Sequence, residues 1–136
     1  MSTITRETGI QSLHDHVVSL VAQRWAKAVQ IKITINTDAE RSRWAESDRT
    51  YPDIVGWKLS AGKNTIDWFA EVETEESLSE SDTHSRWRED AVLGVPFYLF
   101  VPKGQREKAQ KLAVATGVTL NGIYEYFFVN NEFQLS

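Results

Sequence analysis

The chain has 136 residues, no cysteine and a formal net charge of −4 at pH 7. A chain of this length buries about two-thirds of the surface that its unfolded form exposes, so we expect one domain spanning residues 1–136. The lack of cysteine excludes disulfide frameworks, thiolate zinc sites and cysteine nucleophiles. The acidic balance argues against tight general binding to nucleic acid, although a local cluster with a bound cation can still meet phosphates.

No apolar run reaches the ~18 residues of a membrane span, and the first ten residues contain no apolar signal segment. We therefore expect no interaction with membranes and a cytoplasmic protein. Apolar residues at helical spacing predict a helix over residues 11–28. Strict alternation over residues 29–37 predicts a strand with one buried face, and the polar stretch 38–50 is expected to form a loop.

A β-hairpin is predicted next. Two strand-like segments, residues 51–60 and 65–74, flank Ala61-Gly62-Lys63-Asn64, a connection of hairpin length. We expect the two segments to pair antiparallel.

The second half of the chain alternates helices with strands. Ser77 and Glu80 have the spacing of a capping box, while Gly94 and Gly117 are natural helix stops. The predicted elements are a helix over 78–93, an apolar strand over 95–102, a helix over 103–116 and a strand or hairpin within 118–135. Strands interleaved with helices imply an α/β protein with a mixed central sheet flanked by helices.

Three acids lie inside the predicted hairpin. If the chain turns around Gly62, paired residue numbers sum to about 124, so Asp53 lies opposite Glu71 and Glu73 shares their face. Adjacent like charges are destabilising, and unpaired buried anions cost several kcal/mol. A hard divalent cation, Mg²⁺ or Mn²⁺, would compensate them by binding one or two carboxylates together with substrate phosphate. Phosphodiester hydrolysis is the chemistry that follows.

A second interpretation places these acids on a solvated strand edge with no ligand. Val55, Trp57 and Phe69 have the same parity as the acids, so that face is not wholly exposed to water. The apolar neighbours favour the cation-binding interpretation.

Pro52-Asp53, followed after the hairpin by Glu71-Val72-Glu73, resembles the PD-(D/E)xK nuclease superfamily with its restriction-endonuclease-like fold. The resemblance spans roughly residues 13–101 and implies an αβββαβ core. It also implies that Asp53, Glu71 and the backbone carbonyl of Val72 bind Mg²⁺ or Mn²⁺. The expected activity is that of a metal-dependent endonuclease, a hydrolase acting on DNA.

The chain departs from this family at the lysine position, which holds Glu73. Glutamate cannot supply the positive charge of lysine, but it could accept a proton as general base or bind a second metal. The departure leaves an alternative of another class, in which the domain keeps the nuclease fold, has lost catalysis and serves as a protein-binding or assembly module.

The first predicted helix offers few ligands to the acids. The family often adds an acid from this helix, but Asp15 lies near its start and Gln23 is a weak substitute. His14 and His16 are two residues apart, so they point away from each other and do not form a metal pair. We expect both histidines at the surface.

Three cations are candidates for binding substrate phosphates: Arg86 and Arg88 on the helix after the acids, and Lys58 on the hairpin. The alternative for the arginines is an exposed face that forms salt bridges with Glu89 and Asp90. Small size limits the surface for gripping DNA, so a homodimer is one solution, although the sequence marks no interface.

Most of the five tryptophans are expected in the core. Trp25 and Trp87 occupy inward helical positions, and Trp57 and Trp68 belong to paired strands. Trp44, in the polar stretch, is the better candidate for a ligand contact.

Overall fold

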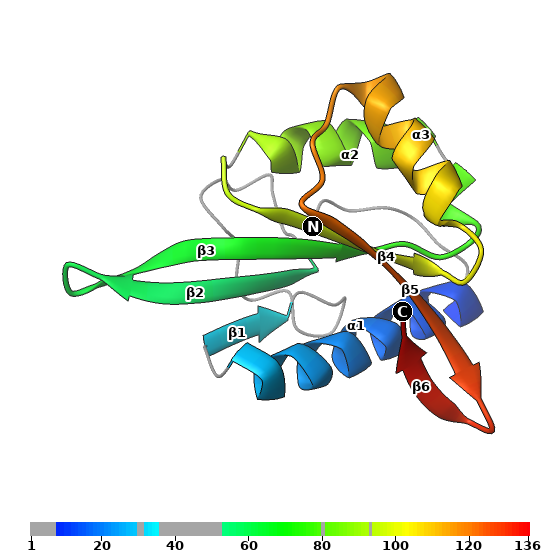
Figure 1. Ribbon diagram of the computed structural model, residues 1–136, viewed down its shortest axis with the longest axis horizontal. Helices are drawn as coiled ribbons and strands as arrows, with labels where there is room; N and C mark the ends of the chain where they lie inside the picture. The colour runs from blue at the N-terminus through cyan, green and yellow to red at the C-terminus, as the bar shows by residue number, and fades with distance from the viewer. Residues whose placement is uncertain (1–7, 30–31, 36–52, 80, 93) are drawn as a thin grey trace.

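The computed structural model describes residues 8–29, 32–35, 53–79, 81–92 and 94–136 (Figure 1). Within this part of the chain, helices alternate with strands in the order that the sequence predicts. The elements are α1 (Thr8–Val29), β1 (Lys32–Ile35), β2 (Ile54–Ser60), β3 (Lys63–Val72), the 3₁₀ helix η1 (Ser77–Ser79), α2 (Ser81–Ala91), β4 (Phe97–Pro102), α3 (Arg106–Thr116), β5 (Gly122–Val129) and β6 (Glu132–Leu135).

The strands form one mixed sheet in sequential order, from β1 to β6. Strands β1, β2 and β3 pair antiparallel, β4 and β5 continue parallel to β3, and β6 returns antiparallel to β5. Each parallel step contains a helix, α2 before β4 and α3 before β5, because a parallel connection needs a crossover. The prediction of a mixed α/β sheet is confirmed.

Helices cover both faces of the sheet, with α1 on one side and α2 and α3 on the other (Figure 1). The alternation of β3 separates two hydrophobic clusters, because successive side chains point to opposite faces. Trp68, Ala70 and Val72 pack with α1, whereas Phe69 packs with Trp87 of α2. The central strand β4 contributes to both clusters, Phe100 to the first and Leu99 to the second, as its apolar sequence predicts.

The β2–β3 hairpin differs from the prediction at its turn. The turn consists of Ala61 and Gly62 alone, both at positive φ (52° and 80°), and Ser60 pairs with Lys63. The expectation that Lys63 and Asn64 belong to the connection is therefore wrong. Such a two-residue turn is usual in hairpins because positive φ there matches the twist of the strands.

A β-bulge in the same hairpin resets the pairing. Trp57 pairs with Ile66, but the next pair is Gly56 with Trp68, so Asp67 is an extra residue on β3. Beyond the bulge, Ile54 pairs with Ala70, a register that places the residue before β2 opposite Glu71. The predicted pairing of the acids is thus reached through a shorter turn plus one bulge.

Gly56 stands beneath the indole of Trp68 at this bulge. A Cβ at position 56 would lie 2.2–2.7 Å from Cε2, Nε1 and Cζ2 of that ring. Only a residue without a side chain leaves room for the buried indole, so glycine is required here for close approach.

Several element boundaries differ from the predictions. Val29 ends α1 and is not part of the first strand, which begins at Lys32. Residues Ser77–Ser79 form η1, and α2 begins at Ser81, so Ser77 does not cap that helix. The Ser77 side chain instead binds Glu73 and Thr74.

The C-terminal part agrees with the sequence patterns. Helix α3 ends at Gly117, whose φ of 74° provides the left-handed cap, and its N–H donates to Ala113 O and Val114 O. Strands β5 and β6 form a hairpin whose turn residues, Asn130 and Asn131, both have positive φ.

Several predictions fall outside the described residues: the loop over 38–50 with Trp44, the positions of Tyr51 and Pro52, and the side chain of Trp25. Within the part that is described, no helix is both long enough and apolar enough to cross a membrane.

Candidate functional site: a buried carboxylate cluster

Asp53 and Glu71 meet where β2 begins and β3 ends. The backbone N–H of Asp53 donates to Glu71 Oε1 at 3.1 Å, and the N–H of Val72 donates to Asp53 Oδ2 at 2.8 Å. Both carboxylates are fully buried. Strand pairing between β2 and β3 stops at Ile54 and Ala70, and beyond this pair the Asp53 side chain accepts the hydrogen bond from the β3 backbone.

The backbone of Val72 faces the same place. Glu73 N–H donates to Phe100 O of β4 at 2.9 Å. Because the directions of backbone groups alternate along a strand, the N–H and C=O of Val72 point away from β4. In a strand the N–H and C=O of one residue point to the same side, and the Val72 N–H binds Asp53. The carbonyl of Val72 is thus directed toward the Asp53 edge.

His14 of α1 is the helix residue that reaches Asp53. It is 1% exposed, and its Nε2 lies 3.1 Å from Asp53 Oδ2. The expectation of a surface position is wrong for His14 and right for His16, which is exposed and stacks on Phe128. Burial raises the pKa of Asp53, but the charge and hydrogen bond of His14 outweigh it and hold that pKa well below its usual range.

A fourth buried acid, Asp90 of α2, contacts Glu71. Burial raises the pKa of Glu71, and the negative charges of Asp90 and Asp53 raise it further. Burial also raises the pKa of Asp90, to about 6, although its hydrogen bond with Glu71 lowers it. With no cation present, burial and the neighbouring negative charges therefore favour the protonated forms of Glu71 and Asp90 over their charged forms.

Glu73 is held by three side chains. Ser77 Oγ donates to its Oε1 at 2.7 Å, Trp87 Nε1 donates to its Oε2 at 3.0 Å, and Arg86 lies 3.4 Å from Oε1. Tyr126 O–H donates to the Glu73 carbonyl at 2.9 Å. Glu73 therefore ties the end of β3 to η1, α2 and β5.

The cluster is anionic even after its cations are counted. Its buried carboxylates are Asp53, Glu71, Glu73 and Asp90. Arg86 supplies one positive charge, and His14 supplies another, because both ring nitrogens face carboxylate oxygens and so both carry protons. Two negative charges remain, and protonation of Glu71, whose pKa is raised, neutralises one of them.

Three carboxylate oxygens of the cluster lack a hydrogen-bond partner. Asp53 Oδ1, Glu71 Oε2 and Asp90 Oδ2 are buried without a hydrogen-bond partner. Across the described residues, no three His, Asp or Glu side chains converge in the arrangement of a metal site. Two carboxylates plus the Val72 carbonyl would form a smaller set, which suits Mg²⁺ because that ion keeps several waters.

The three predicted phosphate-binding cations lie in different environments. Arg86 is 4% exposed and pairs with Glu73, whereas Arg88 is exposed on the same helix. Lys58 is exposed on the hairpin, with its Nζ 3.8 Å from Asp67 Oδ1. Of the three, only Arg86 is adjacent to the acids.

Sequence reasoning missed His14 and Asp90 as members of the cluster. Both follow the buried stripe of their helices: His14 lies three residues before Val17, and Asp90 three residues after Trp87. A polar residue on an apolar stripe was the available signal. Trp87 is fully buried, as its helical position predicts.

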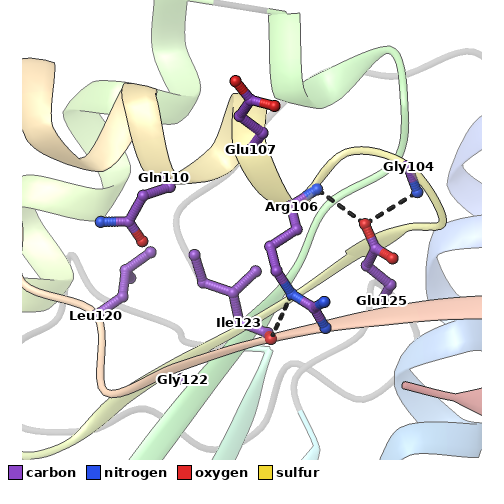
Figure 2. Close-up of a pocket in the computed structure, with 8 residues that line it drawn as sticks. All are labelled: Gly104, Arg106, Glu107, Gln110, Leu120, Gly122, Ile123 and Glu125. Carbon is purple, nitrogen blue, oxygen red and sulfur yellow. Dashed lines mark hydrogen bonds between the residues drawn. The ribbon is translucent and has the colours of Figure 1, made fainter.

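A surface pocket of about 620 Å³ lies elsewhere, between α3 and β5, and none of the four acids lines it. Figure 2 shows Glu125 reaching the start of α3, where its Oε2 accepts hydrogen bonds from the N–H groups of Gly104 and Arg106. The Arg106 side chain donates to the carbonyls of Ile123 and Ser136. These bonds engage Glu125 and Arg106, two charged residues of this pocket, within the fold, so we place the candidate site at the carboxylate cluster.

The cluster brings the predicted pair Asp53 and Glu71 together and adds His14 from α1 and Asp90 from α2. No protein-family model, curated protein or solved structure matches the chain. We therefore infer the function from the geometry of this cluster.

Proposed function

We propose that this protein is a metal-dependent nuclease in which Asp53, Glu71 and the Val72 carbonyl hold one Mg²⁺ or Mn²⁺. The observation that carries the proposal is the pair of buried, unpartnered oxygens, Asp53 Oδ1 and Glu71 Oε2, on residues that are joined by the hydrogen bond from the Asp53 N–H to Glu71 Oε1. Leaving them unpaired costs several kcal/mol, which a divalent cation offsets.

The fold supports this proposal. Helix α1, the antiparallel strands β1–β3, helix α2 and the parallel strand β4 follow the αβββαβ order of the restriction-endonuclease-like core. The acids lie where that family places its metal ligands, at the start of β2 and the end of β3. The resemblance names DNA as the substrate class, and the homodimer and cytoplasmic location belong to the same proposal.

Each residue then has a distinct role. A bound Mg²⁺ would act as a Lewis acid and lower the pKa of a water that attacks the phosphodiester. Asp53 and Glu71 bind the cation, and His14 fixes the orientation of Asp53 through Oδ2, leaving Oδ1 directed away from that bond. Glu73 is engaged by Ser77, Trp87 and Arg86, so its contacts favour a positioning role over that of general base or second-metal ligand.

The second candidate function is the non-hydrolytic module. Two observations favour it: the cluster carboxylates are at most 1% exposed, and the strand lysine is replaced by Glu73. A polymer substrate would reach the acids only after covering residues move. In this alternative the cluster stabilises the fold and partners bind to the surface.

Cleavage of single-stranded, duplex and branched DNA in Mg²⁺ or Mn²⁺ tests the proposal. Asp53→Asn removes a proposed ligand charge while keeping the side-chain shape, and Asp67→Asn is the control because Asp67 lies on the same hairpin away from the cluster. We expect the wild-type protein and Asp67→Asn to cleave and Asp53→Asn to be at least about 100-fold slower.

Manganese titration monitored by tryptophan fluorescence reports binding independently, because the indole N–H of Trp87 contacts Glu73 inside the cluster. If the wild-type and Asp53→Asn proteins neither cleave nor bind manganese, the non-hydrolytic module is the correct function.

A further inference from the structure

Arg86 has an unusual position for a charged side chain. Among the side chains that the structure describes, it is the one lysine or arginine that is buried. Burying a guanidinium is costly unless acids surround it. The acids come from α2 and from the end of β3. Arg86 pairs with Glu73, and Asp90, one helical turn further along α2, contacts Glu71.

The contact between Arg86 and Glu73 is the weakest of the three that hold this carboxylate. Arg86 lies 3.4 Å from Oε1, whereas Ser77 Oγ lies 2.7 Å from the same oxygen and Trp87 Nε1 lies 3.0 Å from Oε2. Ser77 and Trp87 thus satisfy both oxygens of Glu73. Removing Arg86 would leave Glu73 hydrogen-bonded, so satisfying Glu73 is not sufficient reason for a buried arginine.

The charge of Arg86 acts on the whole cluster. Burial lowers the pKa of Arg86, but the charges of Glu73, Glu71, Asp53 and Asp90 outweigh burial and hold the pKa above its usual value. The guanidinium therefore remains a permanent cation beside the proposed metal ligands. The nuclease family that the chain resembles has a lysine at position 73, but Glu73 provides no positive charge there.

We propose that Arg86 is the phosphate-binding cation of this site: its guanidinium donates to a non-bridging oxygen of the phosphoryl group bound beside Asp53 and Glu71. This inference rests on the proposed function and assigns the missing positive charge to α2. Glu73, Ser77 and Trp87 position that helix. The guanidinium is suited to the task because its fork of donors matches two phosphate oxygens.

Removing Arg86 would leave the buried negative charge of Glu73 without its cation. The parent protein for the test is therefore Glu73→Gln, which removes that charge. Into it are introduced Arg86→Met and, as a matched control, Arg88→Met, which removes an exposed arginine from the same helix. Manganese binding is measured by electron paramagnetic resonance. Binding of inorganic phosphate to the manganese-loaded protein is measured by paramagnetic broadening of the ³¹P signal.

We expect Glu73→Gln and its Arg88→Met derivative to bind phosphate equally, and the Arg86→Met derivative to bind it at least about tenfold more weakly. Its manganese affinity should be unchanged or higher, because a cation has been removed from beside the metal. A purely structural Arg86 predicts instead the same phosphate affinity in all three proteins, and that result would overturn the inference.

If the Arg86→Met derivative does not fold, Arg86→Lys in the same parent carries the test. Lysine keeps the charge but not the fork, so phosphate affinity should fall about three- to tenfold at constant manganese affinity. An unchanged phosphate affinity contradicts the inference. Failure of the wild-type protein to bind manganese would instead overturn the proposed function, and this inference with it.

Discussion

His14 Nε2 lies 3.1 Å from Asp53 Oδ2, and the opposite ring nitrogen, Nδ1, lies 3.1 Å from Asp15 Oδ1. The ring therefore bridges a fully buried acid and a partly exposed one. Since α1 and the hairpin are far apart in sequence, this bridge is a tertiary link that fixes the helix against the acids.

Replacing His14 by Gln should destabilise the protein, because it leaves the Asp53 carboxylate buried without its cationic partner. Removing one member of a buried pair costs about 3–5 kcal/mol. Urea unfolding at pH 7 measures the loss. His16→Gln is the matched control, since His16 is exposed two residues further along the same helix, and it should shift stability by less than about 0.5 kcal/mol. Equal effects of the two changes would contradict the bridge.

Asp90→Asn should stabilise the metal-free protein at neutral pH. Burial raises the pKa of Asp90 from its ordinary value of 3.8 to about 6, so between these pH values the folded protein binds more protons than the unfolded chain. Stability therefore falls as the pH rises through this window, by at most about 3 kcal/mol. Asparagine removes this loss.

Urea unfolding between pH 4 and pH 7 tests the Asp90 prediction. The wild-type protein should lose stability over this range, and Asp90→Asn should lose less. Glu89→Gln, an exposed neighbour on α2, is the control. Parallel pH profiles for the wild type and Asp90→Asn would show that Asp90 binds no extra proton in the folded state.

Trp87→Phe should destabilise the fold by about 1–3 kcal/mol beyond the loss of packing, because Glu73 Oε2 then lacks its N–H donor. The expected rescue is Glu73→Gln in the Trp87→Phe background, which removes the charge that has lost its donor. Thermal unfolding of the two single variants and the double variant measures the coupling between the residues. Strictly additive effects would mean that the bond contributes nothing.

Gly56→Ala should be among the most destabilising single changes in the hairpin. Its Cβ would lie within 2.7 Å of three atoms of the Trp68 indole, which is buried and cannot move without disturbing the cluster around α1. We expect a cost of at least about 3 kcal/mol. Gly62→Ala is the comparison: it has open space and only its positive φ, which costs about 1–2 kcal/mol. A smaller effect at Gly56 would contradict the close packing.

Sequence patterns were sufficient where local chemistry decides the structure. The apolar run of β4 and the Gly117 stop of α3 depend on neighbouring residues, and the sequence predicts both. The hairpin of β5 and β6 is one of the two alternatives that the sequence leaves open for residues 118–135. The pair Asp53 and Glu71 was found because hairpin pairing follows from sequence spacing.

The remaining features depend on tertiary contacts. Ser77 has the spacing of a helix cap, but the buried charge of Glu73 binds its hydroxyl, so α2 begins later. His14 and Asp90 resemble surface residues until the helices are packed, and only their place on a buried stripe distinguishes them. The bulge at Asp67 lies beside the close approach of Trp68 to Gly56, a contact across the two strands that no local pattern encodes.

That bulge has a consequence for how the hairpin tolerates insertions and deletions. With the pairing Ser60 to Lys63 at the turn, an unbroken ladder would place residue 70 opposite Asp53, and the small apolar side chain of Ala70 would replace a carboxylate. The extra residue, Asp67, shifts the pairing by one so that Asp53 lies opposite Glu71. Lengthening the tip by one residue on each strand would leave the acids paired, whereas one residue added to β3 alone would place Ala70 opposite Asp53 without altering any residue of the cluster.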